Sequence, residues 1–542
     1  MISLSLSNVT LVLGARSLFR NLFWEIQHDQ KVGLIGPNGA GKSSLLKLIT
    51  GEYSSEPGGG VVRAKGISIG YLPQQPEINL ERTALESALQ GNPRVAEVSF
   101  LLADIEKMLG EPEVFENPRK LGRMIEQQQK LLEEYDTLGG DHYPSLVRQM
   151  LVGLGLSEEE FDKPLSVLSG GQKKLVGLAR LLLAKPSVLL LDEPDNHLDL
   201  KGKVFLEGLI RDYPGAVVIV SHDRYLLDAA VTHITEIEDG RLTTFEGDYS
   251  MYMLDKQERL LRQQRLYSVQ QREIHRLETS IKRLALWGKL YDNEKFAHKA
   301  QSMQKRLDKM EKIEKPILER RMMDLQLNGW RGSNKVLEFS GVDKAFDTNN
   351  LLSDLNFTLW HSERVGLIGP NGSGKSVLLR MILGKELPTT GEIILGPSVR
   401  VGYYAQEHET LDFNQTLIDA VRSTAPLSES GAVAFLLRYL FTYQQVNQKI
   451  CDLSGGERSR LQLALLVLSG ANFLLLDEPT NNLDIASAEV LEAALDEFIG
   501  TVLVISHDRY FLDEVIDRLF VIEGGCLESY PGNYADYLAA KG

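Results

Sequence analysis

The chain of 542 residues has only two cysteines, Cys451 and Cys526, which lie far apart in the sequence. Neither has another cysteine or a suitably spaced histidine nearby, so the sequence does not indicate a disulfide framework, a zinc site or an iron–sulfur cluster. A reducing compartment, the cytoplasm, is therefore expected. The chain also lacks a run of about 18 apolar residues, the length that a transmembrane helix requires. Its first residues, Met1–Leu6, alternate like a strand and lack the basic region that begins a secretory signal.

Positive charge is scarce as well. Lys and Arg number 59 against 74 Asp and Glu, which gives a net charge of -15. A protein that coats nucleic acid through its overall charge would show the opposite balance. Any contact with a polyanion must therefore come from a local basic segment. The hydrophobic content of 43% excludes a wholly disordered or fibrous chain, and the length indicates several domains.

The clearest feature that is present is an internal repeat. Four motifs occur twice, in the same order, and this identifies a tandem duplication with a first and a second half. The pairs are Gly36–Ser43 with Gly369–Ser376, Leu168–Gln172 with Leu453–Glu457, Leu191–Pro194 with Leu476–Pro479, and Ser221–Arg224 with Ser506–Arg509.

The spacing of the repeats locates an insertion. From Ser169 onward the motifs recur with one constant offset, whereas the offset between Gln74 and Gln406 is larger. The first half therefore holds 47 additional residues between Gln74 and Ser169. Helix-like runs at 95–109 and 118–135 predict a small helical hairpin there, within about 92–145. The expected domains are 1–250, with this insertion, a linker at 251–332, and 333–542.

The linker has a different texture, rich in Gln, Lys, Arg, Glu and Leu. Its apolar residues are spaced by three and four, as in the seam of a coiled coil: Ile274, Leu277, Ile281 and Leu284, then Met303, Leu307 and Met310. Two antiparallel helices of about 35 residues, broken near 287–293, would form an arm roughly 50 Å long. Residues Asp255–Arg321 carry a net charge of +8, which leaves −23 on the rest of the chain. A solvated spacer helix is the simpler alternative, but it does not explain this bias.

The glycine-rich motifs predict phosphate binding. Each follows a short apolar run and precedes a helical pattern, the context in which backbone N–H groups and a helix N-terminus surround phosphate oxygens. Lys42 and Lys375 are expected to reach the β- and γ-phosphates, and Ser43 and Ser376 to ligate Mg²⁺. The predicted nucleotide-binding residues are Gly36, Pro37, Asn38, Gly39, Ala40, Gly41, Lys42, Ser43 and Ser44, and Gly369, Pro370, Asn371, Gly372, Ser373, Gly374, Lys375 and Ser376.

Two acidic residues end a continuous apolar run in each half. Such a run is typical of a strand buried on both faces of a parallel sheet, and its carboxyl end faces the ligand crevice. Asp192 and Asp477 are therefore expected to hold Mg²⁺, and Glu193 and Glu478 to polarise the attacking water as general bases. A solvated turn would be the alternative for an isolated Asp-Glu pair.

A histidine and a glutamine follow further strands in each half. His222 and His507 follow their glutamates at the same distance along the chain, which favours a γ-phosphate contact over a structural role. Gln74 and Gln406 follow their lysines at nearly equal distances, so a role in orienting the metal or the water is expected, with a surface glutamine as the alternative.

These motifs, in this order, resemble those of ATP-binding cassette ATPases. The resemblance implies that the halves pair head to tail and hold two ATP molecules between the glycine loop of one half and the Leu-Ser-Gly-Gly turn of the other. The turn residues implied in nucleotide binding are Ser169, Gly170, Gly171 and Gln172, and Ser454, Gly455, Gly456 and Glu457. The expected fold is α/β, with two tandem cassettes joined by an antiparallel coiled-coil linker.

The two cassettes with a charged helical linker are similar to the ABC-F family. This resemblance covers Met1 to about Tyr537 and implies a monomer that binds the ribosome near its E site. The linker would approach ribosomal RNA and the P-site tRNA. It also implies either a translation factor or an antibiotic-resistance protein that protects the ribosome, released when ATP is hydrolysed.

Some residues depart from the family pattern. Asp195 replaces the usual threonine after Glu-Pro, which Thr480 supplies in the second half. Phe346 fits the aromatic on which adenine stacks, but Leu13 occupies the matching position in the first half. The next pair of residues also differs, Asn196-His197 in one half and Asn481-Asn482 in the other. Both sites are expected to be competent, with unequal turnover a possibility left open.

Two other classes of function remain as alternatives. A duplicated ATPase subunit of a membrane transporter would contain the same cassettes, but it would leave the basic linker unexplained. A DNA-maintenance ATPase would use the basic linker on DNA, although the cysteines of the zinc-containing and iron–sulfur relatives are absent.

Overall fold

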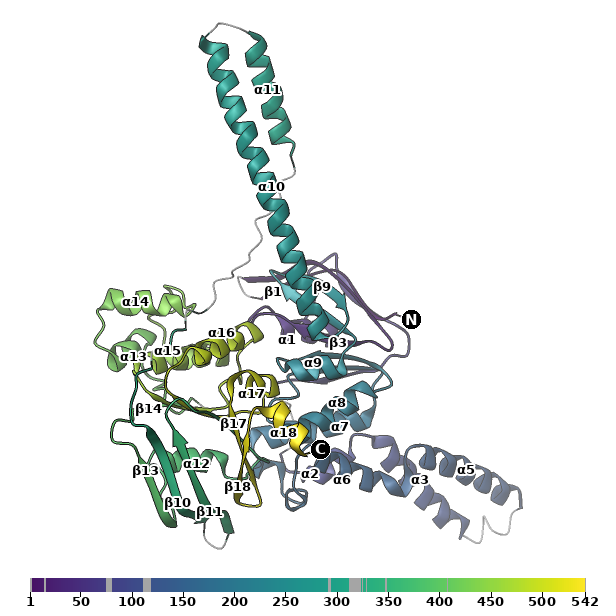
Figure 1. Cartoon of the computed structure of the whole chain (residues 1–542). Helices are drawn as coiled ribbons and strands as arrows, with labels where there is room; N and C mark the ends of the chain where they lie inside the picture. Colours follow the sequence, from purple (N-terminus) through teal and green to yellow (C-terminus); the bar gives the residue numbers. More distant parts are fainter. Residues whose placement is uncertain are drawn as a thin grey trace. The chain divides into compact units, whose positions relative to one another are not determined.

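The computed structural model of the protein describes residues 2–13, 16–74, 80–110, 118–290, 294–310, 323, 325–327, 329–346, 349–406 and 408–541. It divides into two compact units (Figure 1). The first unit combines Met1–Glu246 with Met323–Gly542 and so contains both halves of the repeat. The second unit is Gly247–Met322.

Each half is built on a six-stranded sheet that is parallel except for one edge strand. The sheet of the first half has the order β5-β6-β7-β3-β8-β9 and that of the second half β14-β15-β16-β12-β17-β18. β9 and β18 are the antiparallel edges. The strands of the first half are β3 (Lys31–Ile35), β5 (Ile69–Leu72), β6 (Val188–Asp192), β7 (Ala216–Val220), β8 (His233–Glu238) and β9 (Arg241–Glu246). Those of the second are β12 (Arg364–Ile368), β14 (Val401–Tyr404), β15 (Phe473–Asp477), β16 (Thr501–Ile505), β17 (Arg518–Glu523) and β18 (Cys526–Pro531).

A three-stranded antiparallel sheet accompanies each larger sheet. In the first half it has the order β2-β1-β4, and in the second β11-β10-β13. These strands are β1 (Ile2–Leu13), β2 (Arg16–Gln27), β4 (Gly60–Arg63), β10 (Lys335–Phe346), β11 (Asn349–Trp360) and β13 (Thr390–Leu395). Leu4, Leu34 and Leu45 lie in one buried cluster, so helix α1 (Lys42–Thr50) packs between the two sheets of the first half. The helix α12 (Lys375–Ile382) has the matching position in the second half.

The remaining helices complete the halves. The first half contains α2 (Ala84–Leu89), α6 (Tyr143–Gly153), α7 (Gly170–Ala184), α8 (Leu200–Arg211) and α9 (Arg224–Ala230). The second contains α13 (Leu417–Thr424), α14 (Glu429–Arg438), α15 (Gly455–Leu468), α16 (Ile485–Asp496), α17 (Arg509–Val515) and α18 (Tyr534–Lys541).

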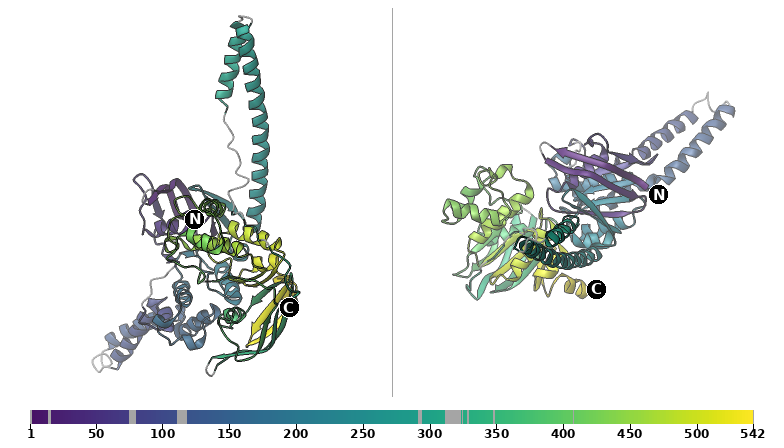
Figure 2. Two further views of the ribbon diagram at one scale, coloured as in Figure 1. Left: turned by 90° about the vertical axis from the view of Figure 1, so that its left-hand side faces the viewer. Right: turned by 90° about the horizontal axis from the view of Figure 1, so that it is seen from above.

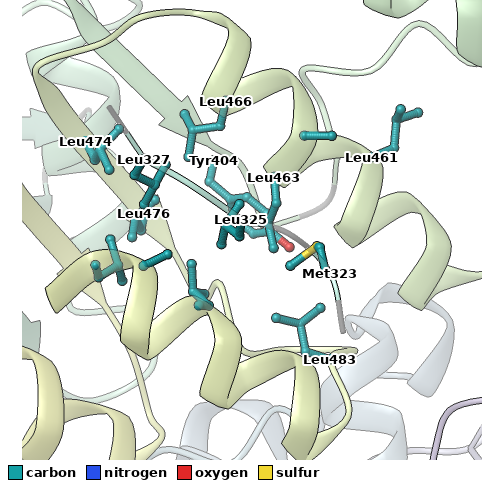
Figure 3. Close-up of a cluster of buried hydrophobic side chains, with 14 of the residues drawn as sticks. Met323, Leu325, Leu327, Tyr404, Leu461, Leu463, Leu466, Leu474, Leu476 and Leu483 are labelled. Atoms are coloured by element: carbon teal, nitrogen blue, oxygen red, sulfur yellow. The ribbon is translucent and has the colours of Figure 1, made fainter. Parts of the chain in front are cut away.

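The segment before β10 contributes Met323, Leu325 and Leu327 to the core formed by α15, β14 and β15, beside Tyr404 and Leu463 (Figure 3). The predicted α/β class with tandem cassettes is confirmed.

The additional segment of the first half contains two helices, α3 (Pro93–Leu109) and α5 (Pro118–Thr137), which lie side by side (Figure 1). Val98, Ile105 and Leu131 form a small cluster of their own between them. Arg94 of α3 also binds the carboxylate of Glu134 of α5 through two nitrogens, at 2.7 and 3.0 Å.

The second unit is a long helix with a shorter helix folded back along it, α10 (Tyr249–Leu290) and α11 (Glu294–Asp308) (Figure 2). The rings of Trp287 and Phe296 are 6.0 Å apart near the turn, and Arg306 lies 3.5 Å from Glu273 further along, so the helices are antiparallel. Leu284 and Leu307 are buried in the predicted seam. The helices are unequal, at 42 and 15 residues, where two of about 35 were expected. The predicted continuation at 311–322 lies outside the described residues. None of the described helices is both long enough and apolar enough to cross a membrane.

Candidate functional site

The first glycine loop joins β3 to α1 and needs glycine at two positions. Gly36 has a φ of 146°, and a Cβ there would lie 2.4 Å from the carbonyl oxygen of Ile237. Gly41 has a φ of 99°, and its Cβ would lie 2.7 Å from the ring of Phe19. The Lys42 Nζ donates to the Gly36 carbonyl at 2.6 Å, and burial lowers the pKa of this ammonium. A buried cation beside inward-turned backbone N–H groups suits a polyphosphate.

A serine and an aspartate meet at the end of β6. The Ser43 hydroxyl donates to Asp192, and burial raises the pKa of that carboxyl. Among the described residues, the Asp192 Oδ1 has no hydrogen-bond partner, so this oxygen is available to accept a hydrogen bond or to bind a cation. Ser376 and Asp477 repeat the contact, and burial raises the pKa of Asp477 to about 6. The donor set fits Mg²⁺ bound together with phosphates, and the described residues form no cluster of three or more His, Cys, Asp or Glu side chains for a metal.

Glu193 is held from several sides. Its backbone adopts a φ of 50°, unusual for a residue with a side chain, and such strain clusters at functional sites. Its carboxylate accepts hydrogen bonds from the Gln74 Nε2 at 2.7 Å and the Asn196 Nδ2 at 2.8 Å. The Lys174 Nζ donates to its carbonyl oxygen at 2.6 Å. The glutamine predicted to orient the metal or the water therefore contacts the glutamate predicted to be the base.

Glu478 has the same backbone but different partners. Its φ is 51°, and its carboxylate accepts a hydrogen bond from the backbone N–H of His507 at 3.2 Å. The His507 Nε2 lies 3.5 Å from the other carboxylate oxygen. Burial, with the nearby Asp477, raises the pKa of Glu478 to about 8. Gln406 is exposed, as Gln74 is, but among the described residues no hydrogen bond joins it to Glu478, so the two halves position their glutamates differently.

His222 and His507, which we call the switch histidines, are held in the neutral form. Burial lowers the pKa of His222 to about 4, and the charge of Lys42 acts in the same direction. Both ring nitrogens of His222 are shielded from solvent and have no hydrogen-bond partner among the described residues. Burial and Lys375 place the pKa of His507 well below its ordinary value. A neutral imidazole with an unused N–H can donate to a phosphate oxygen, as the sequence predicts.

The two Leu-Ser-Gly-Gly turns, which we call the first and second signature turns in chain order, each begin a helix. The Ser169 hydroxyl caps α7 by accepting from the backbone N–H of Gln172, whose side chain in turn accepts from the Ser169 N–H. Ser454 and Glu457 form the same capping box at α15. The glycines at the first helical positions leave the helix N-terminus accessible to an anion.

The first glycine loop faces the second half. The Asn38 backbone N–H donates to the Asp484 carboxylate at 3.0 Å, and its side chain donates to the carbonyl of Asn482 at 2.9 Å. A Cβ on Gly456 would lie 2.9 Å from the Asn38 Nδ2, so the second signature turn lies against the first loop. This is the head-to-tail arrangement that the resemblance implied.

The second glycine loop faces the first half in the same way. The Asn371 backbone N–H donates to Asp199 at 3.4 Å, and its side chain donates to the carbonyl of His197 at 2.9 Å. We call the site with Lys42, Glu193 and the second signature turn the first ATP site. The site with Lys375, Glu478 and the first signature turn is the second ATP site.

The side chains that join the two halves were not predicted from the sequence. Arg224 pairs with Glu492, and Arg509 pairs with Glu207. Each of these residues recurs at the constant offset of the repeat, so a comparison of the two halves could have identified them as candidates. The aspartates Asp199 and Asp484, which contact the opposite loops, carry the same signal. The repeat could identify these positions but not their partners.

The predicted adenine-stacking position is accessible in both halves. Phe346 is 45% exposed at the end of β10, with the Lys344 Nζ 4.6 Å from its ring centre. Leu13, at the end of β1, is 38% exposed and offers no aromatic face. The chemical difference between the two positions therefore stands.

Comparison with known proteins identifies related chains. A family profile described as "ABC transporter" matches residues 19–196 and 352–481, and a second profile with that description matches residues 235–327. "ABC transporter F family member 5" of Arabidopsis thaliana is 34% identical over 98% of this chain and 77% of its own length. "Energy-dependent translational throttle protein EttA" of Escherichia coli K12 is 34% identical over 96% of this chain and 92% of its own.

Solved structures share the fold. The archaeal ribosome recycling factor aABCE1, in complex with the ribosomal stalk protein aP1, superposes with a TM-score of 0.56 at 18% identity. That match covers 98% of this chain and 92% of the other. A model of ribosome-bound archaeal Pelota and ABCE1 gives a TM-score of 0.54 at 18% identity, over 98% of this chain and 80% of the other.

Proposed function

Since this chain belongs to the F family of ATP-binding cassette proteins, we propose that it binds the ribosome in an ATP-bound, closed state and leaves when ATP is hydrolysed. The chain is an ATP-hydrolysing enzyme with two nucleotide-binding cassettes. The observation that carries the proposal is the pairing of each glycine loop with the opposite half, through Asn38 with Asp484 and Asn371 with Asp199. ATP bound between such surfaces would stabilise the closed state over an open one.

This geometry supports the following proposed roles for the site residues. Bound Mg²⁺ would neutralise phosphate charge, with Ser43 and Asp192 as its ligands in the first ATP site and Ser376 and Asp477 in the second. Lys42 and Lys375 would hold the phosphates.

The acid–base groups complete the assignment. Glu193 and Glu478 would accept the proton of the attacking water. His222 and His507 would donate to the γ-phosphate, and the Gln74 amide, which contacts Glu193, would orient that base.

The partner would be contacted by the helical linker. We propose domains at 1–250, 251–332 and 333–542, with the linker reaching ribosomal RNA and the P-site tRNA from the E-site region. The net charge of +8 over Asp255–Arg321, on a chain of net charge -15, supports a polyanionic partner. The working form would be a cytoplasmic monomer, because both halves of the composite sites come from one chain.

The relatives support translation over transport. A curated relative of similar length is named a translational throttle, and the linker that a transporter subunit would not need is the second compact unit of this chain. Whether the role is in ordinary translation or in protection from an antibiotic depends on contacts at the tip of the linker. A drug-susceptibility panel on cells with and without the gene separates these two outcomes.

The experiment is in vitro translation with a trapped variant. Glu193→Gln/Glu478→Gln protein, added at the ribosome concentration to an ATP-containing extract, should arrest peptide synthesis because it binds and cannot leave. The matched control adds Lys42→Ala/Lys375→Ala to the same protein and should relieve the arrest. Equal translation rates with both proteins would contradict the proposal and shift attention to a membrane or DNA partner.

A further inference from the structure

A cluster of buried charged residues, which includes Lys203 and Asp195, distinguishes the first half from the second. At the constant offset of the repeat, Lys203 of α8 is matched by Ala488, and Asp195 is matched by Thr480. Asp223, which accepts a hydrogen bond from Lys203, is repeated in the second half as Asp508. The first half therefore has a cation and an anion that the second half lacks.

The Lys203 ammonium connects the two halves. Its side chain is 10% exposed, and its Nζ donates to the Asp223 Oδ2 at 2.8 Å. The same Nζ donates to the carbonyl oxygen of His507 at 2.8 Å. Lys203 thus joins the segment that follows His222 in the first half to the switch histidine of the second half.

Asp195 belongs to the same cluster. It is 6% exposed and accepts a hydrogen bond from the Ser221 hydroxyl at 3.0 Å, which itself accepts from the backbone N–H of Asp223 at 2.9 Å. Although burial alone would lower the pKa of Lys203, Asp223 and Asp195 raise it above its ordinary value, so the ammonium stays charged. The acid that departs from the family pattern therefore favours the charged form of this lysine.

His507 is held on both sides of its own α-carbon. Its carbonyl accepts from Lys203, and its backbone N–H donates to the Glu478 carboxylate at 3.2 Å. A shift of the His507 peptide would therefore move the histidine relative to the predicted base of the second ATP site. Ala488 has no side chain that could hold His222 in the corresponding way.

We propose that Lys203 is a positioning residue for the second ATP site, and that the contacts of its ammonium with Asp223 and with the His507 carbonyl couple the first site to the second. The coupling passes from the segments after Glu193 and His222, through Lys203, to the His507 carbonyl. The inference rests on the proposed roles of Glu478 and His507 but not on ribosome binding.

ATPase kinetics of variants in which only one of the two ATP sites is intact test the proposal. Glu193→Gln leaves the second site as the working one, and Glu478→Gln leaves the first. In the first of these backgrounds, Lys203→Ala should lower kcat by about tenfold, because a displacement of a positioned group by even about 1 Å is costly, with a smaller change in KM. In the Glu478→Gln background the loss should be under about twofold. Equal losses in both backgrounds, or none in either, would overturn the proposal.

A second variant separates positioning from folding. Asp195→Thr/Lys203→Ala reproduces the residues of the second half and removes one of the two carboxylates whose charge Lys203 balances. It should restore the melting temperature without restoring kcat at the second site. If it restores both, Lys203 is only structural, and the proposal fails.

Hydrogen–deuterium exchange gives a readout that needs no turnover. Lys203→Ala should increase exchange at the backbone amides of residues 505–508 in the second half. An increase confined to the first half, around Asp223, would contradict coupling between the sites.

If neither Glu193→Gln nor Glu478→Gln lowers ATP turnover, the assignment of the bases fails and the proposed coupling fails with it. Loss of ribosome binding alone would leave the coupling unaffected.

Discussion

Arg224 of the first half forms a buried ion pair with Glu492 of the second half. The mirrored pair, Arg509 with Glu207, repeats this contact from the other side. Both arginines also lie over a tyrosine ring of the opposite half, Arg224 at 3.7 Å from the ring centre of Tyr510. The duplication has therefore preserved a two-fold interface as well as two nucleotide sites.

Removing one partner of this pair should be strongly destabilising. Glu492→Ala would remove the nearer of two carboxylates from the buried Arg224 charge and leave Glu489 at 4.0 Å, a loss of about 3 kcal/mol in the free energy of unfolding. Thermal melting should show it as a lowered Tm. The matched control is Glu134→Ala, which breaks the exposed pair with Arg94 and should change Tm little. A similar Tm for both variants would show that the buried pair does not hold the halves.

A methyl group at Gly36 should disrupt nucleotide binding. Its Cβ would lie 2.4 Å from a backbone oxygen at a φ of 146°, so the first loop must move. Strain of about 1–3 kcal/mol would weaken binding of a fluorescent ATP analogue at the first site by about 5- to 150-fold. Gly66→Ala is the control, because Gly66 also has a positive φ but no atom of the described residues lies within 4 Å of the position of its Cβ. Unchanged affinity in Gly36→Ala would contradict the role of this loop.

Loss of both predicted bases should separate binding from hydrolysis. Glu193→Gln/Glu478→Gln should bind ATP with near-native affinity and hydrolyse it at least about 100-fold more slowly, since a general base contributes that much or more. Phosphate release and equilibrium binding measure the two properties on one preparation. Hydrolysis within a few fold of the unmodified protein would remove both glutamates from the mechanism.

Acid should destabilise the protein partly through its switch histidines. Burial lowers the pKa of His222 to about 4, and that of His507 also lies below its ordinary value, so the unfolded chain binds protons more readily at both positions. Their contribution to stability is thus complete above about pH 6.5 and is lost as the pH falls toward 4. His222→Gln/His507→Gln should therefore show a smaller drop in Tm between pH 7 and pH 5. An identical drop would mean that the histidines are not held neutral.

Local chemistry was predictable from the sequence, and contacts between distant segments were not. Ser43 and Asp192 could be expected to meet because the glycine loop after β3 and the carboxyl end of β6 lie at one edge of a parallel sheet. The contact of Gln74 with Glu193 depends on β5 and β6 being neighbours, although the two side chains are far apart in the sequence. The contact of Lys203 with the His507 carbonyl depends on how two separate halves dock, which no local pattern specifies.

The linker shows the same limit. The spacing of Ile274, Leu277 and Ile281 predicted the seam, and Leu284 and Leu307 are buried in it. Two helices of about equal length were predicted; their described parts have 42 and 15 residues, and the predicted continuation at 311–322 lies outside the described residues.

Ribosome co-sedimentation tests the central claim most directly. Glu193→Gln/Glu478→Gln protein is centrifuged with 70S particles, with ATP and without, beside the same protein carrying Lys42→Ala/Lys375→Ala. The account predicts pelleting that requires both ATP and the two lysines. Equal pelleting with and without ATP, or none although the double variant still binds ATP, would contradict an ATP-closed, ribosome-bound state.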